Sequence, residues 1–320
     1  MSKVGIVGLG HLGKIHVQQW LNIVPKENLI CFDTDLQRMQ EISSAYHISS
    51  ALTFEDLLSQ VAVVDVVTPT NYHFDIAKKA LDASKHVFIE KPVCETVSQA
   101  EDLILAQQKA GTLVQIGHVE RYNPAFLAVE SSISHPKFFE IHRLAPYTSR
   151  GSEVSVIMDL MIHDLDIVTH LVHSDVKNIY ANGVSILSRT PDIANVRIEF
   201  ENGCVANLTA SRISMKKMRK MRVFSDKGYT SIDFLERTSE IIEIADKNGQ
   251  DDAGIPFTTN EGQVKYMSSK NYKEMEGNAI FLELSDFYDK IICRKNDTKV
   301  NLFNSLKTLK LAVNIQTRLY

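Results

Sequence analysis

Short apolar runs alternate with longer stretches of helical periodicity through the first third of the chain. Each run has the length of a buried strand and ends at polar or glycine positions. The runs are residues 4–7, 29–33, 63–67, 86–89 and 113–117, and helices are predicted over 12–24, 54–58, 72–83 and 96–110. Repeated strand–helix units with apolar strands predict an α/β fold with a doubly wound parallel sheet, covered on both faces.

The pattern changes after about residue 120, where most strands follow one another directly. Helices are predicted over 124–133 and 154–173, and strands over 138–144, 179–187, 194–200, 204–211, 221–225, 229–234 and 241–245. Residues 246–273 predict a long loop, followed by helices over 279–293 and 301–318. We therefore expect two domains, 1–120 and an α+β domain over 121–320 with a largely antiparallel open sheet. The pattern leaves open whether the last helix packs back on the first domain.

Composition sets the broad class of the protein. The chain has 320 residues, enough for two domains, and its net charge of −4 gives no support for nucleic acid as a partner. Its apolar runs are too short to cross a membrane, so no membrane partner is expected. The four cysteines are widely spaced, which favours reduced thiols, and a strand begins directly after Lys3, so no signal peptide is expected. These observations predict a cytoplasmic protein.

The first apolar run ends in a glycine-rich turn with the spacing Gly8-x-Gly10-x-x-Gly13. Gly8 permits a tight turn, Gly10 lets the backbone approach a phosphate, and Gly13 lets the next helix pack close to the strand. The amides at the start of that helix then point toward negative charge. Because a strand precedes the turn and a helix follows it, we interpret it as a dinucleotide-binding turn.

Asp33 closes the second strand, twenty residues after Gly13. An acid at this spacing accepts hydrogen bonds from both hydroxyls of an adenosine ribose and repels a 2′-phosphate, which favours NAD over NADP. The alternative is that Asp33 only caps the next helix, as we expect of Asp35. No arginine follows Asp33 directly, and the nearest is Arg38.

Ligands of such sheets bind at the carboxyl ends of the strands, where the polar segments of this half of the chain gather. Lys91 follows the fourth strand, where an ammonium can hold a substrate hydroxyl and stabilise negative charge; the alternative is an ordinary surface lysine. Pro92 restricts Lys91 to extended geometry, and the bond between them is a candidate for the cis form. The residues expected to bind the cofactor are Gly8, Gly10, His11, Leu12, Gly13, Asp33, Thr68, Pro69, Asn71, His73, Glu90 and Lys91.

The predicted helix over 154–173 carries Asp159, His163, Asp166 and His170, whose spacing places them on one face. Three interpretations are open. A solvated polar face is the first, although the other positions are apolar around most of the helix and predict burial. A metal site is the second, although no further cluster completes a ligand set, and we predict none. A histidine general base oriented by a carboxylate is the third, which we favour.

These motifs together resemble the glucose-fructose oxidoreductase / inositol dehydrogenase / MocA (Gfo/Idh/MocA) family over essentially the whole chain. The resemblance is carried by residues 8–13, 68–73, 90–92 and 159–164. It implies an N-terminal Rossmann domain and a C-terminal domain whose open sheet often forms a homodimer or homotetramer. It also implies an NAD(P)-dependent oxidoreductase acting on CH–OH groups, in which Lys91, Asp159 and His163 are catalytic.

A narrower resemblance lies in residues 117–124 and 158–164, which are similar to a branch of the family that oxidises C3 of UDP-N-acetylglucosamine. It implies an NAD-dependent dehydrogenase of a nucleotide sugar that yields a 3-keto sugar. The expected substrate-binding residues are Lys91, His118, Arg121, Tyr122, Asn123, Arg143, Asp159 and His163. Basic residues over 212–222 could also face a diphosphate, although for most of them we expect solvated charge at the strand edges.

Three other functions stay open at this point. A dehydrogenase of a free sugar or a cyclitol would need no nucleotide pocket. A non-catalytic NAD-binding sensor would have no use for the acid–base set of Lys91, Asp159 and His163. NAD-dependent glycoside cleavage is a further activity that the family resemblance implies.

Overall fold

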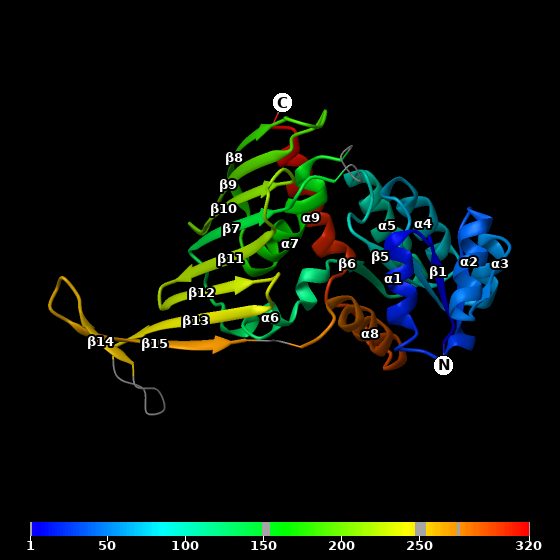
Figure 1. The fold of residues 1–320 in the computed structure, drawn as a ribbon, viewed down its shortest axis with the longest axis horizontal. Helices are drawn as coiled ribbons and strands as arrows, with labels where there is room; N and C mark the ends of the chain where they lie inside the picture. The colour runs from blue at the N-terminus through cyan, green and yellow to red at the C-terminus, as the bar shows by residue number, and fades with distance from the viewer. Residues whose placement is uncertain (1, 149–153, 247–253, 274–275, 320) are drawn as a thin grey trace. The chain divides into compact units, whose positions relative to one another are not determined.

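The computed structural model describes residues 2–148, 154–246, 254–273 and 276–319, and it divides the chain into two compact units (Figure 1). The first unit consists of Met1–Val119 and Asn278–Lys310, and the second of Glu120–Gly277 and Leu311–Tyr320. The chain therefore returns to the first unit late. Helix α8 (Ala279–Ile292) belongs to the first unit, and α9 (Leu302–Gln316) is shared between the two.

The described part of the first unit is built on a parallel sheet in the order β3-β2-β1-β4-β5-β6, which confirms the predicted doubly wound sheet. The strand order reverses between β1 and β4, and this switch point is where such sheets bind ligands. The strands are β1 (Val4–Val7), β2 (Leu29–Phe32), β3 (Ser49–Ser50), β4 (Val63–Val66), β5 (His86–Glu90) and β6 (Val114–Gly117). The helices, besides α8 and part of α9, are α1 (His11–Trp20), α2 (Leu36–Tyr46), α3 (Phe54–Gln60), α4 (His73–Asp82) and α5 (Val97–Ala110).

Helix α8 completes one core of this unit. Its Phe287 is fully buried and packs against Phe88 of β5, with ring centroids 5.9 Å apart, and its Tyr288 packs edge-on against Trp20 of α1. The sequence pattern predicted this helix but assigned it to the second domain. A helical period shows that one face is buried, but not which core covers it.

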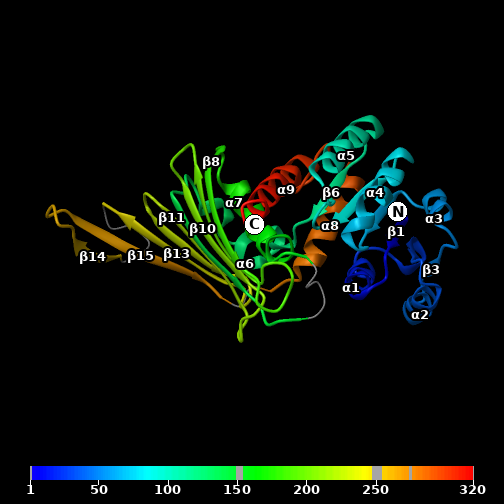
Figure 2. The same cartoon turned by 90° about the horizontal axis from the view of Figure 1, so that it is seen from above.

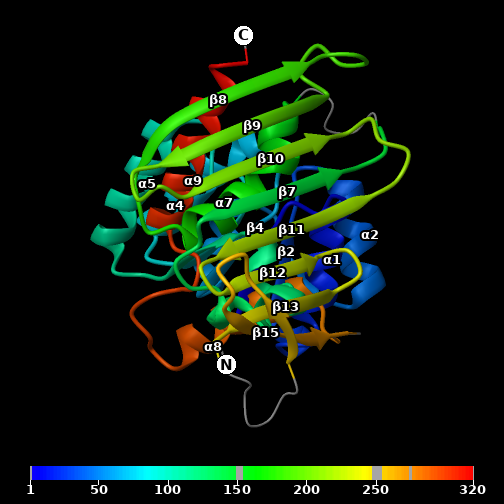
Figure 3. The same ribbon diagram turned by 90° about the vertical axis from the view of Figure 1, so that its left-hand side faces the viewer.

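The described part of the second unit holds a mixed sheet in the order β14-β15-β13-β12-β11-β7-β10-β9-β8 (Figure 3). Its neighbours are antiparallel except for the β7–β10 pair, which is parallel, so the predicted largely antiparallel sheet is confirmed. The strands are β7 (Phe138–Leu144), β8 (Val176–Val184), β9 (Ile193–Phe200), β10 (Val205–Ser211), β11 (Met218–Ser225), β12 (Gly228–Asp233), β13 (Thr238–Ala245), β14 (Ile255–Thr258) and β15 (Val264–Tyr272).

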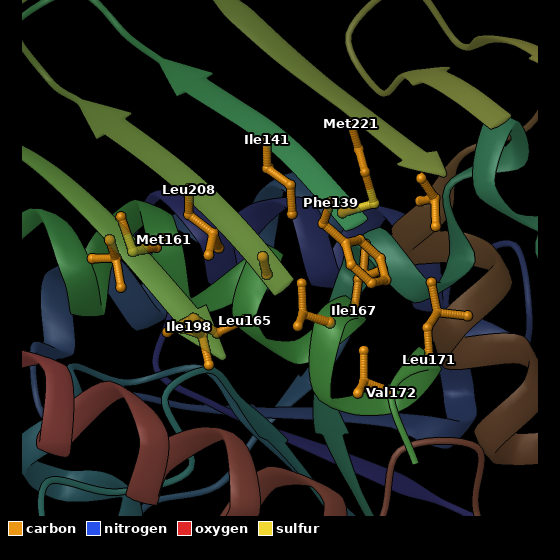
Figure 4. Close-up of a cluster of buried hydrophobic side chains, with 14 of the residues drawn as sticks. Phe139, Ile141, Met161, Leu165, Ile167, Leu171, Val172, Ile198, Leu208 and Met221 are labelled. Carbon is orange, nitrogen blue, oxygen red and sulfur yellow. The ribbon is translucent and has the colours of Figure 1, made fainter. Parts of the chain in front are cut away.

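One face of this sheet carries the core of the second unit (Figures 2 and 4). Helices α6 (Pro124–Leu127) and α7 (Ile162–Leu171) lie on that face. Inward-facing Phe139 and Ile141 of β7 pack with Leu165 of α7 in one buried cluster. The alternation of buried and half-buried positions along β7 is the period-two pattern from which this strand was predicted.

The prediction of a long loop over 246–273 is wrong for the residues described there. These residues form β14 and β15, which pair with each other, and β15 also pairs with β13. All four residues of β14 are exposed and β15 is exposed or half-buried along its length, so no buried face imposes an apolar period. Residues 247–253 of the predicted loop lie outside the described residues.

Candidate active site

The glycine turn between β1 and α1 has the geometry of a phosphate cradle. Gly8 has φ of +93°, and a Cβ there would lie 2.8 Å from the side chain of Thr68. A Cβ on Gly13 would lie 1.9 Å from the carbonyl oxygen of Gly8, whereas nothing lies within 4 Å of the Cβ position of Gly10. Gly10 is the N-cap of α1 and makes no side-chain cap bond, and His11 and Leu12 begin the helix. The turn therefore fits a dinucleotide pyrophosphate.

Asp33 lies beside this turn, at the end of β2, and is 8% exposed. Its Oδ2 accepts a hydrogen bond from the backbone N–H of Leu9 at 2.7 Å, and its Oδ1 accepts one from the N–H of Asp35. Asp35, not Asp33, is the N-cap of α2. Arg38 Nη1 lies 3.5 Å from Asp33 Oδ2. The Arg38 cation could bind a 2′-phosphate, whereas the Asp33 carboxylate beside it is expected to repel that phosphate. The ribose role of Asp33 stays a prediction.

His73 joins the ends of β4 and β5. Its Nε2 lies 2.7 Å from the carbonyl oxygen of Thr68, and its Nδ1 lies 2.9 Å from that of Pro92, which follows Lys91 through a cis peptide bond. Burial lowers the pKa of His73, which favours the neutral ring. The other cofactor residues predicted after β4 are exposed: Pro69 and Asn71.

A chain of three buried ionisable side chains, which we call the triad, consists of Asp65, His16 and Glu90. His16 Nδ1 lies 2.8 Å from Asp65 Oδ2, and its Nε2 lies 3.2 Å from Glu90 Oε1. Asp65 Oδ2 also accepts a hydrogen bond of 2.7 Å from Trp20 Nε1, and Glu90 Oε2 accepts one from the backbone N–H of Lys91. The triad thus connects α1, directly after the glycine turn, to the end of β5.

The charges of the triad follow from this geometry. Burial alone would lower the pKa of His16, but Asp65 and Glu90 raise it to about 10. Burial likewise opposes the ionisation of Glu90, yet the imidazolium beside it lowers the pKa of this carboxyl. His16 is therefore an imidazolium whose Nδ1 donates to Asp65 and whose Nε2 forms an ion pair with Glu90, and Glu90 is a carboxylate.

The candidate catalytic residues of the second unit lie where two helix types meet. Ile157–Met161 form a π-helical turn, and α7 begins directly after it, so the prediction of one regular helix over 154–173 is wrong. A π-turn has i→i+5 bonds, so the four-residue spacing of Asp159 and His163 does not correspond to one regular α-helical turn. Both side chains are half-buried, whereas Asp164 and Asp166 are almost fully buried. Burial of most of this segment confirms the expectation from its apolar circumference.

Asp164 and Asp166 belong to what we call the arginine network, two groups of ion pairs inside the second unit. Arg143 donates from Nε and Nη2 to both oxygens of Asp164, at 2.9 and 2.7 Å, and from Nη1 to Glu120 at 2.9 Å. Arg121 Nε donates to Asp166 at 2.8 Å. Burial would lower the pKa of Arg143, but Asp164 and Glu120 raise it. Both arginines are at most 3% exposed, so this geometry favours a structural role over the predicted substrate contact.

The other predicted substrate residues are also buried. Asn123 caps α6, donates to Glu120 and to the carbonyl oxygen of Phe234, and is 7% exposed. Tyr122 is 4% exposed, and His118, at the end of β6 in the first unit, lies 3.5 Å from the Ser305 hydroxyl.

His170, the last residue of the predicted polar face of the helix over 154–173, contacts Glu130 at 2.6 Å rather than its helix neighbours.

The basic residues over 212–222 separate into two kinds. Arg212 is buried and donates to the carbonyl oxygens of Val154 and Pro191, which holds the chain shortly before the π-turn. The others are exposed or partly exposed, and three pair with carboxylates at 3.4–3.8 Å: Arg219, Lys220 and Arg222. The exposed residues of this run have the solvated charge that we expected.

The triad was not predicted from the sequence, although two signals of it were present. Asp65 is a charged residue in the middle of a valine-rich strand, and a buried charge requires a partner. His16 lies four residues before Trp20, on the face of α1 that the core covers.

In the ranges given above, no group of three or more His, Cys, Asp or Glu side chains is arranged to bind a metal ion. Among the same residues, no helix has both the length and the apolarity needed to span a membrane.

Comparison with known proteins agrees with this architecture. Residues 2–118 match the model of an oxidoreductase family with an NAD-binding Rossmann fold, and residues 126–231 match the Gfo/Idh/MocA C-terminal domain. UDP-N-acetylglucosamine 3-dehydrogenase of Acidithiobacillus ferrooxidans is 35% identical over 75% of this chain and 76% of its own. A solved structure of that enzyme superposes with a TM-score of 0.89 at 30% identity, covering 99% of this chain and 97% of its own.

A cyclitol enzyme is also among the relatives. The scyllo-inositol 2-dehydrogenase (NAD(+)) of Bacillus subtilis is 25% identical over 66% of this chain and 68% of its own. One assignment is supported by both domain models, by the parallel sheet of the first unit and the mixed sheet of the second, and by the glycine cradle. The chain belongs to the Gfo/Idh/MocA family and is an NAD(P)-dependent oxidoreductase that acts on CH–OH groups.

Proposed function

We propose that this protein is an NAD-dependent dehydrogenase of a nucleotide sugar, and that it oxidises C3 of UDP-N-acetylglucosamine to the 3-keto sugar. The observation that carries the proposal is the 35% identity to an enzyme of that name, over three quarters of both chains. This chain also has Lys91, Asp159 and His163 at the positions that match the family's catalytic motifs.

We assign roles to these side chains by their chemistry. NAD, when bound, supplies the hydride acceptor. His163 accepts the hydroxyl proton at a ring nitrogen, Asp159 orients that ring, and the Lys91 ammonium holds the hydroxyl oxygen. Gly8, Gly10 and Gly13 hold the pyrophosphate. Asp33 binds the adenosine ribose, Glu90 and His73 shape the nicotinamide end, and Tyr122 and Asn123 support the substrate side.

The deciding experiment is a substrate panel read by NADH formation. UDP-N-acetylglucosamine is compared with UDP-glucose, free N-acetylglucosamine, myo-inositol and scyllo-inositol, and we expect it to give the highest kcat/KM. Higher kcat/KM with an inositol would support the second candidate, a cyclitol dehydrogenase, which the Bacillus subtilis relative favours. On the true substrate, His163→Ala should lower kcat at least about 100-fold while NADH binding persists. His173→Ala, at an exposed histidine beyond the end of α7, is the matched control.

We also propose NAD rather than NADP as the cofactor, because Asp33 closes β2 beside the glycine turn, where an acid can accept hydrogen bonds from an adenosine ribose. Asp33→Ala should bring NADP turnover closer to NAD turnover, since Arg38 then keeps only Asp35 as an acidic partner, at 3.1 Å, and its Nη1 can face the 2′-phosphate. The double variant with Arg38→Ala should lose that gain. An unchanged NAD/NADP ratio in Asp33→Ala would contradict the ribose role. Assembly through the sheet of the second unit is a further proposal from the family resemblance.

A further inference from the structure

The triad ends with Glu90 at the ligand edge of the parallel sheet, on the β4–β5 side of the glycine turn. The order β2-β1-β4-β5 places Asp33 beyond one side of the turn and Glu90 beyond the other. Adjacent strands lie about 4.8 Å apart, so β5 is about 10 Å from β1, which one mononucleotide can span. With the adenosine half at Asp33, the nicotinamide half extends toward Glu90.

We propose that His16 is a positioning residue that keeps Glu90 in its carboxylate form, and that this carboxylate makes the protein bind oxidised NAD more tightly than NADH. The inference rests on the proposed cofactor site, because it requires the nicotinamide at the β5 side. The oxidised ring is cationic and the reduced ring is neutral, so a fixed negative charge nearby discriminates between them. Both forms make the same pyrophosphate and ribose contacts, so these contacts cancel in the ratio of the Kd of NADH to the Kd of NAD.

The surroundings of Glu90 support this assignment. From α1 it faces the His16 imidazolium, which is itself neutralised by Asp65 of β4 at 2.8 Å. Lys91 and His73 also interact with it electrostatically, and burial lowers the pKa of His73. A Cβ on Gly117 of β6 would lie 2.8 Å from Glu90 Oε1, so the glycine there leaves room for the carboxylate.

The charge balance of the triad explains why a histidine is used. Asp65 and the imidazolium cancel, which leaves the net negative charge on Glu90, the member nearest the ligand edge. Without the imidazolium, Glu90 would keep its contacts with Lys91 but would lose the cation at 3.2 Å while remaining buried, so its pKa would rise. The selectivity for oxidised NAD should therefore depend on pH only when His16 is absent.

The test measures the Kd of NAD and of NADH by titration calorimetry at pH 6, 7.5 and 9, without substrate. In the wild type the ratio Kd(NADH)/Kd(NAD) should be constant across this range. Glu90→Gln should lower the ratio about tenfold at every pH. His16→Gln should lower it similarly at pH 6 and restore it toward the wild-type value at pH 9, as Glu90 ionises.

Trp20→Phe is the matched control, because it removes a hydrogen bond to Asp65 without changing any charge. A merely structural role for the triad would weaken both ligands equally and leave the ratio unchanged in all three variants. An unchanged ratio in Glu90→Gln, with binding retained, overturns the inference while the proposed function stands. Failure of the wild type to bind either form overturns both.

Discussion

Each unit buries a cluster of charges, and the two clusters differ in the cation at their centre. The triad of the first unit is organised around an imidazole, and the arginine network of the second around guanidinium groups. Both cations are almost fully buried between two carboxylates. A histidine can release its proton within the range in which proteins are studied, whereas an arginine cannot. The cation of the triad, next to the cofactor edge, is therefore titratable, whereas the guanidinium groups of the arginine network keep their charge.

Removing Arg143 from the arginine network should cause the largest loss in the free energy of unfolding. Arg143→Met leaves Asp164 without its bidentate partner and Glu120 without its nearest cation, so the free energy of unfolding should fall by about 4–5 kcal/mol. Urea unfolding followed by circular dichroism measures the loss. Hydrogen exchange in α7 should rise, while fluorescence of Trp20, the only tryptophan, reports the first unit separately. A loss below about 1 kcal/mol would contradict the structural role.

Removing the cation of the triad should lower the free energy of unfolding by less than Arg143→Met does, and this loss should depend on pH. The pKa of His16 is raised from 6.5 to about 10, so its stabilisation is complete below pH 6.5 and is lost as the pH rises toward 10. His16→Gln should therefore lower the free energy of unfolding by about 3 kcal/mol at pH 6 and by much less at pH 9.5. Urea unfolding followed by Trp20 fluorescence measures both. An equal loss at both pH values would mean that His16 is neutral in the folded protein.

The same contrast separates what the sequence could predict from what it could not. The glycine turn, the parallel sheet and the alternation of β7 are local patterns, and the structure confirms the sheet and that strand at its predicted bounds. His16, the charged partner of Asp65, lies 49 residues away in the chain, and Asp164 lies 21 residues from Arg143, so no local period encodes these pairings. The sequence predicted functional arginines but not that carboxylates already neutralise them.

Two further differences between the predicted and the observed elements have local causes. The π-turn before α7 is a change of helix type within one apolar segment, and the hydrophobic period around Asp159 continues through it. Strands β14 and β15 have no buried face, so their composition is that of a loop. The roles of Lys91 and His163 were argued from their positions in the sequence and are also implied by the family resemblance, and they stay predictions.

A smaller effect is expected from the hydrogen bond that anchors the triad. Trp20→Phe removes the Nε1 donor to Asp65, a charge-assisted bond, and should lower the free energy of unfolding by about 2 kcal/mol. Because this variant lacks tryptophan, circular dichroism follows the transition. Tyr288→Phe, which removes a bond of 3.1 Å from a neutral hydroxyl to a backbone carbonyl, is the control and should cost about 1 kcal/mol. A larger loss in the control would show that packing, not charge, dominates here.

The smallest effect should come from a second arginine on the same carboxylate oxygen. Arg219 Nη1 lies 3.6 Å from Glu120 Oε1, the atom that Arg143 contacts at 2.9 Å, but its side chain is 47% exposed. Solvent and salt screen such a pair, so Arg219→Ala should lower the free energy of unfolding by at most about 1 kcal/mol, and less at high salt. The two variants thus compare a buried cation at 2.9 Å, which also binds Asp164, with an exposed cation at 3.6 Å on the same oxygen. If Arg219→Ala cost as much as Arg143→Met, the charge of Glu120 would require both cations, and burial would not be what distinguishes them.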